Sequence, residues 1–139
     1  MAAPGAGYSG TPLWKKLGLR AGGTVLTVNT PPNYRKLLVG HPKGVAFVTA
    51  AEAPHPFVHL FTDSAADLAT RLPQLKTDLA PDGVIWVSWP KKASGVRTDV
   101  TEDAVRFVAL PLGLVDVKVC AVDSTWSALK LVVRLRDRR

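Results

Sequence analysis

A loop between two apolar segments carries the densest set of residues that could bind a ligand. Residues 90–98 read PKKASGVRT and precede an expected helix. The residues suited to an anion are Lys91, Lys92, Ser94, Gly95 and Arg97. A loop that runs into a helix N-terminus adds free N–H groups and the positive end of the helix dipole. This pattern predicts an anion site, and the alternative is a solvated loop whose charges only keep the chain soluble.

Further candidates follow the carboxyl ends of expected strands, where ligands gather in open α/β sheets. Asn29 and Thr30 follow the first strand, Asp63 follows the third, and Trp89 ends the fourth. We expect these side chains to contribute to the same ligand site as the loop. Turn chemistry is the alternative role for Asn29, and capping of the next helix is the alternative for Asp63.

Trp126 and Asp123 lie at an expected hairpin tip in the last third of the chain. An indole beside a carboxylate could stack on a partner protein or a ligand, because its apolar ring carries a polar edge. The alternative is that Trp126 packs against its own sheet.

Histidine and cysteine indicate no second site. His55 and His59 are four residues apart, but Pro54 and Pro56 forbid the helix that would bring them to one face. Cys120 lies in an expected strand with no base beside it, so packing is its simplest role. We therefore expect neither a metal site nor a catalytic residue.

Strands and short helices alternate along the chain and must position these candidates. Apolar, β-branched runs predict strands at residues 24–29, 45–50, 57–62, 84–89, 115–121 and 129–135. Capping and helix-breaking residues predict short helices near residues 12–17 and 33–39, and helical spacing predicts longer ones near residues 65–79 and 102–112. The alternation predicts a three-layer α/β sandwich with a mostly parallel six-stranded sheet that ends in an antiparallel hairpin. We predict the strand order 2-1-3-4-6-5 in chain numbering.

Local signals mark the ends of several elements. Ser64 is the expected N-cap of the third helix, and either Asp99 or Thr101 is that of the fourth. Pro73 lies inside the third helix, so we expect a kink or two stacked short helices. Residues 81–83, which read PDG, should form a turn before the fourth strand.

The composition is typical of one well-packed domain. The chain has 139 residues, 47% of them hydrophobic, and a mean hydropathy of +0.12. We expect a flexible segment at residues 1–11, a single domain at 12–135 and a basic tail at 136–139. A single cysteine fits a reducing cytosol. The net charge is +7 and no carboxylate precedes Glu52, which suits an acidic partner or a polyanion.

Several stretches resemble known families. Residues 17–26 (LGLRAGGTVL) resemble the lead-in to the first strand of class I methyltransferases, and residues 78–87 (DLAPDGVIWV) resemble a turn and strand late in that fold. An uncharacterised bacterial family, catalogued as domain of unknown function 3052, is similar to this chain at residues 7–13 (GYSGTPL), 86–92 (WVSWPKK) and 123–127 (DSTWS). The resemblance implies a reduced methyltransferase-like, Rossmann-like fold that lacks one helix–strand segment.

The first strand departs from the methyltransferase pattern where the cofactor would bind. Class I methyltransferases follow this strand with an acidic residue and a Gly-x-Gly turn that approaches S-adenosylmethionine closely. Here residues 28–34 read VNTPPNY, and Pro31 and Pro32 replace the glycines. The prolines remove two N–H donors and add ring bulk. The resemblance therefore implies weak or absent binding of S-adenosylmethionine, and we expect no bound cofactor.

These observations favour a non-catalytic methyltransferase-like module in the cytoplasm. Its expected ligand is an anionic small molecule or an acidic partner, held at the carboxyl ends of the strands. One alternative is a small S-adenosylmethionine-dependent methyltransferase with a rebuilt cofactor pocket. Another is a non-specific nucleic-acid binder, although no expected helix is dense in Arg and Lys.

Overall fold

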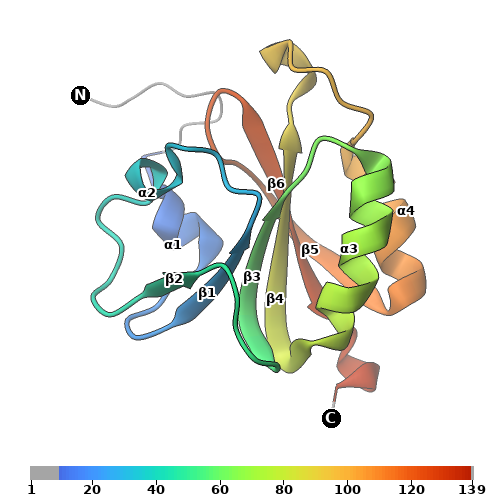
Figure 1. The fold of residues 1–139 in the computed structure, drawn as a ribbon, viewed down its shortest axis with the longest axis horizontal. Helices are drawn as coiled ribbons and strands as arrows, with labels where there is room; N and C mark the ends of the chain where they lie inside the picture. Colours follow the sequence, from blue (N-terminus) through green and yellow to red (C-terminus); the bar gives the residue numbers. More distant parts are fainter. Residues whose placement is uncertain (1–9, 139) are drawn as a thin grey trace.

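The computed structural model, which describes residues 10–138, is a six-stranded sheet with helices on both faces (Figure 1). Its helices and strands are α1 (Leu13–Leu17), β1 (Thr24–Val28), α2 (Tyr34–Leu37), β2 (Ala46–Val48), β3 (His55–Phe61), α3 (Ala65–Thr77), β4 (Leu79–Pro90), α4 (Glu102–Ala109), β5 (Leu114–Ala121) and β6 (Trp126–Val133). Short 3-10 turns form at η1 (Lys92–Ser94), η2 (Leu110–Leu112) and η3 (Leu135–Asp137). Within residues 10–138, no helix has the length and apolar character of a membrane span.

The strand order β2-β1-β3-β4-β6-β5 confirms the order predicted from the sequence. The sheet is mixed: β1 pairs in parallel with β2 and β3, and β3 does so with β4. Strand β6 runs antiparallel to both of its neighbours, β4 and β5. After β1 the chain moves outward to β2 and then returns to β3 on the other side of β1. The carboxyl ends of β1 and β3 therefore form a topological switch point, the usual place for a ligand in such sheets.

A hydrophobic core fills each side of the sheet, because residues along a strand point alternately to its two faces. The core beneath α3 and α4 includes Val58, Leu60, Leu68, Ile85, Val87 and Val105. The core beneath α1 and α2 includes Leu17, Tyr34, Leu38, Phe61, Trp86 and Ala128. In Figure 1 the two helix pairs lie on opposite sides of the strands. The Trp86 indole fastens α1 to the sheet by donating to the Leu17 carbonyl at 3.0 Å.

The two longer helices begin at side-chain caps. Ser64 caps α3 as predicted, since its hydroxyl accepts from the Asp67 N–H at 3.1 Å. Thr101 caps α4 in the same way, whereas the Asp99 carboxylate accepts from the Ala65 N–H at 2.7 Å. The Asp99 side chain therefore binds a backbone N–H at the start of α3 and does not cap α4. Helix α3 is also continuous through Pro73. Of the two predicted alternatives, the division into two short helices is therefore wrong, and the kink stays a prediction.

The predicted turn at residues 81–83 is part of the long strand β4. The register between β3 and β4 shifts between His55 and Phe57, which absorbs the extra residues. Gly83 is buried at this irregularity, and a Cβ there would lie 2.9 Å from the His55 carbonyl oxygen. The pairing of β3 with β4 therefore holds residues 81–83 in an extended conformation, although their residue types favour a turn.

Candidate functional site

A hollow of about 170 Å³ lies at the switch point between the carboxyl ends of β1 and β3. Its lining residues are Asn29, Phe61, Thr62, Asp63, Asp67 and Trp126. Two of the residues expected at the strand ends, Asn29 and Asp63, thus lie together with Trp126, for which the sequence predicts a separate partner surface. The β5–β6 hairpin brings the indole to this end of the sheet.

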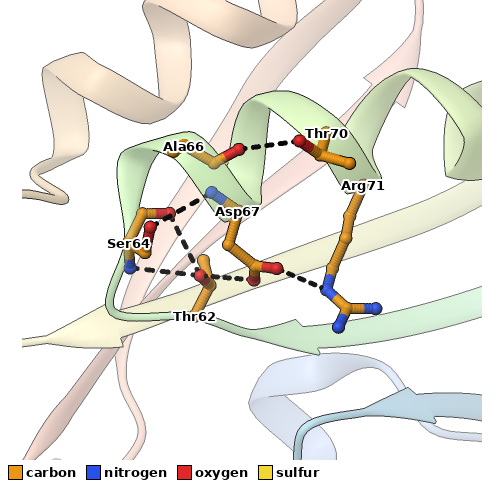
Figure 2. A network of polar contacts seen from close by, with 6 residues as sticks. All are labelled: Thr62, Ser64, Ala66, Asp67, Thr70 and Arg71. Carbon is orange, nitrogen blue, oxygen red and sulfur yellow. Dashed lines mark hydrogen bonds and ion pairs between the residues drawn. The ribbon is translucent and has the colours of Figure 1, made fainter.

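A network of polar contacts surrounds Thr62 and Asp67, two of the lining residues, at the start of α3 (Figure 2). The Thr62 hydroxyl donates to one oxygen of Asp67 at 2.8 Å, and Arg71 donates to the other at 2.8 Å. The backbone N–H of Ser64 donates in turn to the Thr62 hydroxyl at 3.2 Å. Asp67 therefore has its carboxylate positioned from two sides, and Arg71 balances its charge locally.

Asp63 is the carboxylate that remains available to a ligand. Its backbone carbonyl accepts from the Thr98 hydroxyl at 2.7 Å, so the loop and the strand end are fixed to one another. Within residues 10–138, no hydrogen bond or ion pair involves the Asp63 carboxylate. Asn29 lines the same hollow and has a left-handed φ of 58°, a conformation that Asn tolerates better than most residues. This lining is acidic and suits a cation, whereas the sequence predicts an anion as the ligand.

Two aromatic rings complete the lining. The rings of Phe61 and Trp126 meet edge to face with centroids 5.0 Å apart. Asp123, the other residue expected at a partner surface, instead accepts from the Thr125 and Trp126 N–H groups at 2.8 Å each. Its role in the structure is to hold the hairpin turn, and that turn in turn positions the indole.

A buried hydrogen-bonded chain next to the Phe61 ring was not predicted from the sequence. The Tyr34 hydroxyl is 2.9 Å from Nδ1 of His59, and Nε2 of His59 is 2.7 Å from the Ser88 hydroxyl. Phe61 stacks on the His59 ring at 4.3 Å. Burial lowers the pKa of His59 to about 3 and raises that of Tyr34. The imidazole is therefore neutral at physiological pH. The sequence does contain a signal for this chain, because His59 and Ser88 are polar residues inside the otherwise apolar strands β3 and β4.

The cationic loop at residues 90–98 does not line this hollow. The Ser94 hydroxyl donates to the Lys91 carbonyl at 2.6 Å and accepts from the Val96 N–H at 3.1 Å. Gly95 ends η1 with a φ of 78°, while Lys92 and Arg97 are exposed. The Ser94 hydroxyl, which was expected to bind a ligand, therefore forms hydrogen bonds within the loop.

The other two expected site residues also lie outside the hollow. Trp89 is 7% exposed and packs in the core beneath α3 and α4, because alternation along β4 turns it away from Trp86. Thr30 is half-buried just beyond β1.

The fold resembles solved methyltransferases, although no family model and no curated protein sequence matches the chain. A SAM-dependent methyltransferase from Aquifex aeolicus superimposes with a TM-score of 0.62 at 14% identity, covering 87% of this chain and 88% of that one. The CcbJ methyltransferase from Streptomyces caelestis does so with a TM-score of 0.53 at 10% identity, covering 88% and 87%. At these identities the likeness concerns the fold alone. Because no family model matches the chain, its membership of the family of unknown function stays a prediction. The chain has an α/β fold with a six-stranded sheet like that of SAM-dependent methyltransferases.

Proposed function

We propose that this chain is a small S-adenosylmethionine-dependent methyltransferase with a rebuilt cofactor pocket. In this proposal the sulfonium end of the cofactor occupies the hollow between the carboxyl ends of β1 and β3. The observation that carries the proposal is the position of that hollow: it lies at the switch point of a sheet whose solved structural neighbours are methyltransferases.

The lining has the chemistry that a sulfonium or ammonium group requires. The carboxylate of Asp63 supplies negative charge, and the Asn29 amide offers a carbonyl oxygen. A cation held near an indole such as that of Trp126 gains about 0.5–2 kcal/mol from the ring quadrupole. S-adenosylhomocysteine carries no charge on its sulfur, so we expect it to bind roughly 2- to 30-fold more weakly at this site.

The size of the hollow limits how much of the cofactor it could enclose. Its volume of about 170 Å³ is below the ~300–1,000 Å³ of ordinary ligand pockets, so the adenosine would lie outside, along residues 29–32. Pro31 and Pro32 offer no N–H donors there. Losing two hydrogen bonds costs about 1–3 kcal/mol, or roughly 5- to 150-fold in affinity. We therefore propose weak binding.

Calorimetric titration with S-adenosylmethionine, up to millimolar concentration, tests this site. Trp126→Leu should weaken binding roughly 2- to 30-fold, and Asp63→Asn about two- to fivefold, because an exposed carboxylate contributes little. Asp82→Asn is the matched control, since Asp82 is an exposed carboxylate in the first half of β4 and does not line the hollow. Absence of binding by folded wild-type protein, or equal affinity in all variants, would contradict the proposal.

The second candidate is a non-catalytic module that binds a small cation without transferring a methyl group. The replacement of two glycines by Pro31 and Pro32, together with the small volume of the hollow, favours this function. Formation of S-adenosylhomocysteine separates the two candidates when the protein is incubated with S-adenosylmethionine and a small-molecule extract as methyl acceptor. Product formation that Trp126→Leu reduces supports the enzyme, whereas saturable binding without product supports the module.

A further inference from the structure

A second hollow, of about 650 Å³, lies beside α1 at the edge strand β5. Three lysines line it, two from α1 (Lys15 and Lys16) and one from β5 (Lys118), together with Thr11 and residues 119–121. No carboxylate is among these lining residues. Chain positions about one hundred residues apart thus contribute positive charge to one concave surface.

The sheet places a further like charge beside Lys118. In the antiparallel register of β5 and β6, Lys118 is directly opposite Lys130. Like charges opposite one another in an antiparallel pair are destabilising. Neither lysine is ion-paired to a carboxylate anywhere in residues 10–138. Instead, the Lys118 ammonium donates to the Lys16 carbonyl at 3.3 Å, which holds it against α1.

We propose that this hollow, defined by Lys15, Lys16 and Lys118, binds the phosphate group of a small phosphorylated molecule. Ammonium groups are compact charges suited to phosphate oxygens, and their hydrogen bonds to a phosphate are charge-assisted. A bound phosphate would offset the repulsion between Lys118 and Lys130. The remaining lining (Thr11, Val119, Cys120 and Ala121) contains no aromatic ring on which a nucleobase could stack, which favours a small ligand over single-stranded nucleic acid.

Cys120 gives this site a built-in reporter, because it lines the hollow and is the only cysteine of the chain. Burial raises the pKa of the Cys120 thiol, while the charges of Lys16 and Lys118 lower it. An anion bound between the lysines would cancel part of their effect and raise the thiol pKa further. Alkylation by the neutral reagent iodoacetamide, measured at constant pH, should therefore slow when the site is occupied.

Calorimetric titration with inorganic pyrophosphate at low ionic strength tests the site directly. Lys118→Gln and Lys15→Gln should each weaken binding about tenfold, since each removes one charge-assisted contact. Lys92→Gln is the matched control: it removes the same charge from an exposed position in the loop at residues 90–98. Pyrophosphate should slow alkylation of Cys120 in the wild type and in Lys92→Gln, and much less in Lys118→Gln.

Circular dichroism of each variant shows whether a loss of binding reflects loss of fold. We expect Lys118→Gln to melt at or above the wild-type temperature, because it removes the repulsion from Lys130. Three results would overturn the inference: no saturable binding of pyrophosphate by the wild type, an equal loss in Lys92→Gln, or unchanged affinity in both hollow variants. The first two would indicate a diffuse basic surface.

Discussion

Lowering the pH from 7.5 to 5 should weaken the fold through one buried imidazole, that of His59. Its ring is fully buried and both nitrogens are within hydrogen-bonding distance of hydroxyls. Burial lowers its pKa from 6.5 to about 3. Between these two values the unfolded chain binds a proton that the folded chain does not bind. The free energy of unfolding therefore falls as the pH is lowered from 6.5 towards 3.

The size of this effect follows from the two pKa values. Between pH 7.5 and pH 5, protonation of His59 in the unfolded state removes about 2 kcal/mol of stability. For a domain of this length that corresponds to a melting temperature lower by about 5–10 °C. His59→Gln cannot titrate, so its stability should lack this part of the pH dependence. At pH 7.5 the variant should itself be less stable, because its bonds to Tyr34 and Ser88 are disturbed.

Urea denaturation at pH 5, 6 and 7.5 measures the effect as a difference between wild type and variant, in which the carboxylates common to both cancel. His41→Gln is the control, because His41 is a half-buried loop residue bonded to the neighbouring Pro42 carbonyl. We expect it to retain the wild-type pH dependence. Equal pH dependence in wild type and His59→Gln would refute the reasoning and show that the ring accepts a proton in the folded state.

Two further predictions concern stability. Gly83→Ala should destabilise the protein by about 1–3 kcal/mol in urea denaturation, because its Cβ would lie 2.7 Å from Leu79 Cδ1 and 2.9 Å from two carbonyl oxygens; a change below ~0.5 kcal/mol would show that the strands relax. Thr101→Ala should cost about 1 kcal/mol through loss of the cap on α4, and Thr101→Ser should restore most of it; equal loss in both variants would exclude the cap as the cause.

The strands could be located because the signals that define them are local, and their order followed from the resemblance to the class I methyltransferase fold. Apolar runs end at clear breaks, and Ser64 has a cap position that depends only on the residues that follow it. The turn at residues 81–83 could not be read correctly, because the pairing that draws it into β4 involves His55, which is distant in sequence. At such places the packing of distant strands overrides the local conformational preference of the residues.

The candidate site was predicted only in part, for the same reason. Asn29 and Asp63 were placed correctly at strand ends, since that position follows from the fold class. The hydrogen bond from Ala65 to Asp99 spans 34 residues, and that from Lys118 to Lys16 spans 102. No local pattern contains such contacts. The anion site at residues 90–98 stays a prediction: its cations are adjacent in sequence, whereas those beside α1 come together only in the fold.

The central claim is that S-adenosylmethionine binds in the hollow beside Trp126. The NMR signals of the indole N–H groups of the four tryptophans test this claim most directly. Trp126 lines the hollow, Trp86 and Trp89 are buried in the two cores, and Trp14 lies on α1. In a 15N-labelled sample titrated with S-adenosylmethionine, we expect the Trp126 signal to move progressively and saturate while the other three stay nearly still. A Trp126 signal that does not move at millimolar ligand, or a larger shift at another tryptophan, would contradict the account.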